Sequence, residues 1–204
     1  MKKILFTIVA LSALFVSCQK SNEDKASDLI KECMNKTLYH PETYEGVETV
    51  VDSAFAPFDS PEFFEKTLKV AKIGVEISQA ESDMKNAKSS MSIWSGPYQG
   101  AFGRNEYQEA KDKYDTATEN KEKLTKKVQK IADELKEELA KEPVFIGFKA
   151  RHKYRANNNA GNTMFGEIKF VFDKNLSKVI AEYDMEGEEY VAVQQLYKMM
   201  IGEE

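Results

Sequence analysis

Cysteine and histidine, which often serve as nucleophiles, bases or metal ligands, are scarce in this chain of 204 residues: there are two of each. Two cysteines cannot build a disulfide framework. Cys33 recurs at helical spacing with apolar residues, which is typical of a small buried side chain. Cys18 is different, because it follows Ser17 at the end of an apolar run. Its role therefore depends on how the amino terminus is processed.

The two histidines are predicted to have structural roles. His40 precedes a proline at the end of a predicted helix, and His152 lies on the apolar side of a predicted strand. The sequence contains no HExxH or CxxC pattern, so it gives no support for a metal site. Ser82 and Lys85 fit a Ser-x-x-Lys nucleophile pattern, but the companion motifs of that class are missing. We therefore predict no catalytic residue, metal or cofactor.

A stripe of basic residues is the strongest polar pattern in the chain. Its members alternate along a predicted strand: Lys149, Arg151, Lys153 and Arg155. Such a stripe can contact an anionic sugar, a lipid headgroup or an acidic partner. The alternative is pairing with acidic residues on neighbouring strands. The candidates for that pairing are Glu167, Glu182 and Asp184.

Aromatic residues gather in the segment WSGPYQGAFGR, whose glycines and proline predict a chain reversal. They are Trp94, Tyr98 and Phe102, and Trp94 is the only tryptophan of the chain. One interpretation is a small cap that closes the end of a helical hairpin. The other is an exposed contact for a protein or glycan partner, because tryptophan and tyrosine dominate interaction hot spots.

Residues 1–17 predict a signal peptide. MKK supplies positive charge, and the apolar run that follows is shorter than the roughly 20 residues needed to span a bilayer. The segment FVSC resembles a bacterial lipobox in Val16, Ser17 and Cys18, with Phe15 in place of the usual leucine. This resemblance implies cleavage before Cys18 and lipidation of its sulfur. The alternative is cleavage by the ordinary signal peptidase, which leaves a free thiol.

Residues 18–26 are predicted to form a polar tether. Gln19 stands where aspartate would be the usual inner-membrane retention signal, so the resemblance implies the outer membrane. Glu23 and Asp24 resemble the export signals of Bacteroidota surface lipoproteins. With a net charge of −5, the chain lacks the basic excess typical of nucleic-acid-binding proteins.

The remainder, residues 27–204, is predicted to be a single α+β domain. A helix over residues 26–38, with Ser27 as N-cap, precedes a strand over residues 46–58. Three strands and a last helix are predicted at residues 144–156, 164–173, 178–185 and 186–202. In the first of these strands, apolar side chains from Val144 to Tyr154 are expected to face one way. We expect a small antiparallel sheet of about four strands, packed with the N- and C-terminal helices.

Between the first strand and the other three, residues 61–142 predict a long antiparallel helical hairpin inserted into the domain. Apolar residues recur in alternating steps of four and three over residues 73–94 and 107–139, which is a heptad seam of coiled-coil type. Only Lys121 interrupts the second run. Many alanines in the seam predict close approach of the helices, and mixed charges elsewhere predict a solvated outer face.

A second resemblance joins the segments HPETYEG and HKYRANNNAGNTMFGEIKFVFD. Its matching positions are Pro41, Thr43, Tyr44, Arg155, Asn157 and Gly166. Over about half of the chain that follows the signal peptide, the pattern resembles a small domain that recurs in uncharacterised bacterial envelope proteins. It implies membership of an envelope lipoprotein family and adds no catalytic residue.

These patterns lead to the hypothesis of a lipid-anchored outer-membrane or periplasmic lipoprotein that works as a non-enzymatic binding or interaction module. Its partner would be a protein or a glycan. Two alternatives remain: a hydrolase of glycan or cell-wall material, and a structural subunit of an envelope complex. A hydrolase would need coupled carboxylates, or His152 reachable from a cleft.

Overall fold

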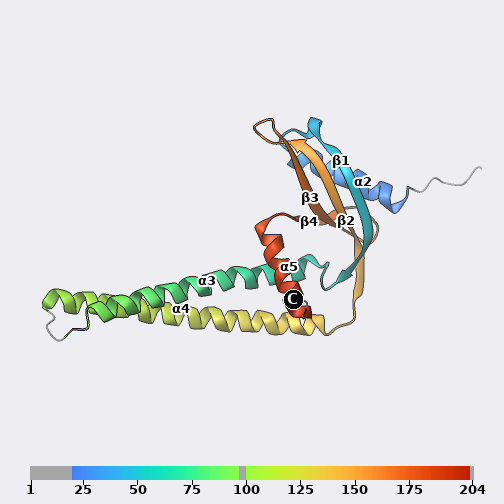
Figure 1. Ribbon diagram of the computed structural model, residues 1–204. Coiled ribbons are helices and arrows are strands. Elements are labelled where there is room, and N and C mark those ends of the chain that lie inside the picture. Colours follow the sequence, from blue (N-terminus) through green and yellow to red (C-terminus); the bar gives the residue numbers. More distant parts are fainter. Residues whose placement is uncertain (1–19, 97–99, 203–204) are drawn as a thin grey trace, which may run out of the picture. The chain divides into compact units, whose positions relative to one another are not determined.

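The computed structural model describes residues 20–96 and 100–202 (Figure 1). The described elements are α2 (Asn22–Thr37), the 3-10 turn η2 (Pro41–Thr43), β1 (Glu45–Ala56), α3 (Pro61–Ile93), α4 (Ala101–Leu139), β2 (Val144–Asn157), β3 (Thr163–Phe172), β4 (Val179–Asp184) and α5 (Glu188–Ile201). The four strands form one antiparallel sheet in the order β1-β2-β3-β4. This arrangement confirms the predicted α+β class with an inserted helical hairpin.

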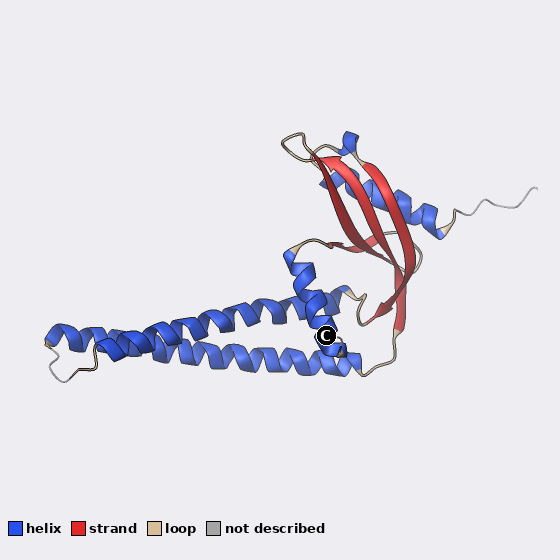
Figure 2. Cartoon of the chain, in the orientation of Figure 1, coloured by secondary structure: helices blue, strands red, loops and turns tan. Residues whose placement is uncertain are grey.

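Contacts divide the described residues into two compact units. The sheet unit comprises the residues up to Asp52 together with Gly147–Glu182, and the hairpin unit comprises Ser53–Ile146 together with the residues from Tyr183 onward. Figure 2 shows that α2 belongs with the strands, whereas the hairpin unit is built mainly of helices. Each unit has its own hydrophobic core.

The core of the sheet unit lies between α2 and the strands. One face of α2 carries apolar residues four positions apart, which places them on one line of the helix: Ala26, Ile30 and Met34. They pack against side chains from β2 and β3, principally Ala150, Phe170 and Phe172. Phe170 and Phe172 are fully buried, so α2 and the middle of the sheet stabilise each other by excluding water.

The start of α2 differs from the prediction. The helix begins at Asn22 and its N-cap is Ser21, so Ser27 lies inside the helix and residues 22–26 are not tether. Ser21 Oγ accepts a hydrogen bond from the Asp24 N–H at 3.1 Å, and the Asp24 carboxylate accepts one from the Ser21 N–H at 3.2 Å. This capping box supports a polar first turn that apolar periodicity does not register.

The alternation predicted for β2 holds from Phe148 to Ala156, where β2 pairs with β3. It does not extend to Val144, whose side chain is 59 % exposed. The interruption is Gly147, whose φ of +150° is rarely adopted by other residues. A Cβ at this position would lie 2.1 Å from the carbonyl oxygen of Phe172. The close backbone approach therefore requires glycine and breaks the regular pleat.

The core of the hairpin unit lies at the base of the hairpin. Phe63, Phe64 and Leu68 of α3 pack with Leu135 of α4 and with α5. The buried residues of α5 are Val193 and Tyr197, and its Tyr190 ring lies 6.3 Å from the Tyr183 ring at the end of β4. These contacts hold the C-terminal helix against α3 and the last strand.

Away from the base, the seam between α3 and α4 is made of small residues, as predicted. The buried alanines of this seam are Ala80 and Ala87 of α3 and Ala110 and Ala117 of α4. The one interruption, Lys121, reaches across to α3 and pairs with Glu81 at 2.7 Å. The cation is therefore accommodated at the edge of the seam.

Shortening a phenylalanine of β3 to alanine should cost much more stability at a buried position than at an exposed one. We expect Phe170→Ala to lower the free energy of unfolding by about 3–5 kcal/mol, because the deletion leaves a cavity under α2. The matched control is Phe165→Ala on the same strand, whose side chain is 71 % exposed and whose removal should change stability by no more than about 0.5 kcal/mol. Urea unfolding followed by circular dichroism measures both, and equal losses would contradict this account of the core.

Candidate functional site

The polar centre of the sheet unit is His152, whose side chain is only 2 % exposed. The Tyr44 hydroxyl lies 2.9 Å from Nε2, and the Thr49 hydroxyl lies 2.8 Å from Nδ1. A neutral imidazole has one N–H donor and one acceptor, and two hydroxyls can satisfy both. The ring also stacks on Tyr154, with centroids 6.2 Å apart and planes 2° apart. The predicted structural role of His152 agrees with this geometry.

An irregularity in β1 makes room for the imidazole. Glu45 and Glu48 both reach basic side chains on the same face of β2, although residues three apart in a regular strand point to opposite faces. The pleat of β1 is therefore irregular between them. Gly46 lies in this stretch, and a Cβ there would stand 3.1 Å from Cε1 of His152. Irregular strands of this kind re-aim side chains next to binding sites.

A pocket of about 300 Å³ opens between α2 and β1 beside this cluster. Its polar lining includes Ser27 and Lys31 of α2, together with Tyr44, Thr49 and His152. Burial lowers the pKa of His152 below its ordinary 6.5, partly offset by a hydrogen bond to the backbone of Glu48. Burial also raises the pKa of the Tyr44 hydroxyl. At neutral pH the cluster of His152, Tyr44 and Thr49 is therefore uncharged, and it presents hydrogen-bonding groups.

Most positions of the envelope-domain resemblance lie close to this cluster and have structural partners. The Thr43 hydroxyl donates to the His40 carbonyl at 2.7 Å and accepts from the Asn157 N–H at 2.9 Å, which ties η2 to the end of β2. Gly166 faces the Tyr154 ring, and a Cβ there would lie 2.8 Å from it. The pattern is therefore explained by packing and hydrogen bonding within the sheet unit.

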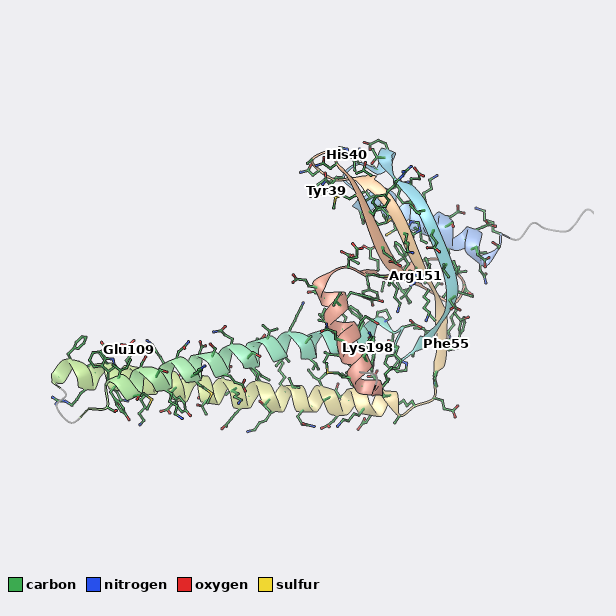
Figure 3. The ribbon with its side chains drawn as sticks, viewed as in Figure 1. Tyr39, His40, Phe55, Glu109, Arg151 and Lys198 are labelled. Carbon is green, nitrogen blue, oxygen red and sulfur yellow. The ribbon has the colours of Figure 1, made fainter. Side chains whose placement is uncertain are left out.

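Carboxylates on neighbouring strands pair with three members of the basic stripe on β2, which are Arg151, Lys153 and Arg155. Arg151 lies 3.2 Å from Glu167, as one predicted pairing required. Two further partners lie on β1: Lys153 pairs with Glu48 at 2.9 Å, and Arg155 Nε donates to Glu45 at 2.9 Å. Figure 3 shows Arg151 on this strand. Acidic partners on neighbouring strands thus offset the charge of these three side chains, which an external anion would need.

Cys33 has a partner that the sequence did not suggest. Its thiol donates to a carboxylate oxygen of Glu182 at 2.7 Å, so this predicted partner of the basic stripe is engaged by the thiol. Burial, reinforced by the neighbouring carboxylate, raises the pKa of the thiol from 9.0 to about 12. Because the thiolate is the reactive form, Cys33 is poorly suited to nucleophilic chemistry. Cys18 lies outside the described residues.

The aromatic residues at the far end of the hairpin are only partly brought together. The Trp94 and Phe102 rings meet edge to face with centroids 5.6 Å apart. Trp94 is half-buried, whereas Phe102 is 66 % exposed. Tyr98, the third predicted member, lies outside the described residues. The two rings that are described form a contact with each other and still leave apolar surface in solvent.

The described residues show neither a metal-binding group of side chains nor a helix suited to span a membrane. Residues 20–96 and 100–202 hold no group of histidine, cysteine, aspartate and glutamate side chains arranged to bind a metal ion. None of the helices in this part of the chain combines the length and the apolar character needed to cross a bilayer.

Comparisons with protein-family models, with curated protein sequences and with solved structures find no match for this chain.

The buried imidazole should make stability depend on pH. Between the ordinary pKa of 6.5 and the lower pKa of folded His152, the unfolded chain binds a proton that the folded chain does not. The free energy of unfolding should therefore fall as the pH decreases through 6.5. Urea midpoints at pH 7.5, 6.5 and 5.5 should show this slope in the wild type and a smaller one in His152→Gln.

The control is His40→Gln, which replaces the other histidine of the chain, a ring that is not buried. The slope should be reduced more in His152→Gln than in this variant. An unchanged slope in His152→Gln would contradict the assignment.

Proposed function

We propose that the protein is a lipid-anchored lipoprotein of the bacterial outer membrane, on its periplasmic or outer face, and that its helical hairpin is a non-enzymatic interaction arm. The anchor part rests on the lipobox resemblance at Cys18. Because α2 begins at Asn22, only residues 19–21 separate the anchor from the first helix. At about 3.6 Å per residue this tether is short, so the sheet unit would stay close to the membrane surface.

The observation that carries the arm proposal is the uneven burial along the hairpin. Its base packs large side chains such as Phe63 and Leu135, whereas the distal half (residues 80–94 and 101–123) covers mainly alanines. Because hydrophobic stabilisation is roughly proportional to the apolar area buried, the distal half, whose larger apolar side chains such as Met84 and Tyr114 are only half-buried, contributes less to the stability of the unit than the base does. A long extension that adds less stability than the base favours a role in reaching a partner.

The exposed side chains at the far end support the same proposal. Ile93 and Phe102 are 73 % and 66 % exposed, and Trp94 is only half-buried. Large apolar side chains that gather at an exposed tip are typical of contact sites.

The hydrolase alternative has weaker support. His152 lines a pocket, but its ring is buried and both of its nitrogens are bonded to Tyr44 and Thr49. A general base needs a lone pair that can reach substrate. Glu48, the carboxylate residue in the pocket lining, is already paired with Lys153.

The anchor is tested by metabolic labelling with an alkyne fatty acid. We expect the wild-type chain to take up the label and to fractionate with membranes, and Cys18→Ala to lose both properties. Cys33→Ala is the matched control and should keep both, because this thiol is engaged with Glu182. Label retained in Cys18→Ala would refute the anchor.

The arm is tested by a shortened variant that lacks residues 80–93 and 104–117. Two heptads are removed from each helix, so the seam keeps its register and the chain keeps Trp94, Phe102 and the base of the hairpin. Crosslinking and affinity capture from membranes should lose a partner that the full-length chain retains.

Circular dichroism of the shortened variant checks that its remaining helices and sheet are intact. Capture of the same partners by both chains would contradict the arm proposal. That result would favour the alternative of a structural subunit assembled through other surfaces.

A further inference from the structure

A long groove follows one side of the distal half of the hairpin. It has a volume of about 850 Å³ and is lined by α3 from Ala80 to Trp94 and by α4 from Glu106 to Lys123. The buried alanines of the seam form its floor, and Trp94 lines its far end. Glu109, which lines the groove, is labelled on α4 near the end of the hairpin in Figure 3.

The walls of the groove carry a clear excess of negative charge. Five carboxylate residues line it against two lysines: Asp83, Glu106, Glu109, Asp112 and Glu119 against Lys113 and Lys123. Each lysine is already paired within its own helix, Lys113 with Glu109 at 2.6 Å and Lys123 with Glu119 at 2.7 Å.

The remaining carboxylates include two with neutral hydrogen-bond donors. The Gln79 amide donates to Asp83 at 2.9 Å, and the Gln108 amide donates to Asp112 at 2.8 Å. An amide donor orients a carboxylate without neutralising it. The groove therefore keeps a negative charge for a cationic partner to offset.

The shape of the groove fits a helix. Two antiparallel helices leave a longitudinal furrow, and a floor of alanine lets a third backbone approach closely. The α4 wall runs from Glu106 to Lys123, which is roughly 27 Å at 1.5 Å per residue. A helix of about 18 residues, with a narrow stripe of small or apolar residues between basic ones, matches this length and charge.

We propose that the groove is the docking site for a lysine- or arginine-rich amphipathic helix of a partner protein, which would complete a three-helix bundle. This inference rests on the proposed function of the hairpin as an interaction arm, and it names the surface and the chemistry of the partner. A second copy of the chain is the poorer occupant, because the chain itself is acidic with a net charge of −5. Charge complementarity would guide encounter and set specificity.

The test uses Trp94, the only tryptophan of the chain, as a reporter that lines the groove. The probe is a synthetic helical peptide of about 20 residues made of alanine and lysine, added to the full-length chain in nonionic detergent. Its binding should change Trp94 fluorescence in a saturable way and weaken as salt is raised from 50 to 300 mM. The matching alanine–glutamate peptide should produce no change.

Charge variants locate the binding. Asp83→Asn with Asp112→Asn should weaken binding of the lysine peptide at least fivefold. The control pair is Asp115→Asn with Asp133→Asn, which removes two aspartates of α4 that do not line the groove. Asp133 also accepts a hydrogen bond from a glutamine four residues earlier, Gln129, at 2.9 Å, so its environment matches that of Asp112. The control pair should stay within twofold of the wild type.

Equal effects of the two variant pairs, or equal binding of the two peptides, would overturn the proposal. The shortened hairpin separates this failure from that of the arm itself. If the shortened chain loses its membrane partner while the lysine peptide does not bind the wild type, the arm stands and the basic helix is wrong. If the shortened chain keeps every partner, the arm proposal fails.

Discussion

The close approach of two long helices through alanine is the constraint on which the hairpin unit depends. Alanine at Ala80 and Ala87 faces a partner helix that also presents alanine, at Ala110 and Ala117. This seam holds only while the heptad register is kept on both sides. The same small side chains leave a furrow beside the seam. The larger residues at the base then fix the register and attach α5.

The constraint in the sheet unit is different, because a histidine is buried there among aromatic and aliphatic side chains. A buried polar group is costly unless it is hydrogen-bonded. Tyr44 and Thr49 provide one partner for each nitrogen of His152, and Gly46 provides the space. Tyr44 immediately precedes β1, Thr49 lies in β1 and His152 lies in β2. Their hydrogen bonds therefore also fix how β1 pairs with β2.

The elements of the fold could be predicted from local patterns, whereas the partners of individual side chains could not. Heptad spacing identified both helices of the hairpin, and alternation identified β2. The start of α2 was missed because Ser21 and Asp24 act through capping, which carries no apolar signal. The alternation before Phe148 failed because Gly147 approaches the backbone of β3.

The candidate sites show the same limit. His152 was correctly expected to be structural, but its partners Tyr44 and Thr49 lie more than a hundred positions earlier in the chain. For the basic stripe, pairing with acidic residues on neighbouring strands was one of two interpretations, and Arg151 pairs in this way with Glu167. The partners on β1 required the strand order, which no local pattern encodes.

The insertion of the hairpin between β1 and β2 has a consequence for folding. In the unfolded chain, pairing of β1 with β2 must close a loop of roughly 90 residues, at an entropic cost of roughly 4 kcal/mol. The contacts between α3 and α4 are sequential neighbours in a hairpin and can zip from the turn without such a loop. Once they have formed, only residues 57–60 and 140–143 separate the strands from the helices. Formation of the hairpin therefore brings β1 close to β2 and lowers the entropic cost of pairing them.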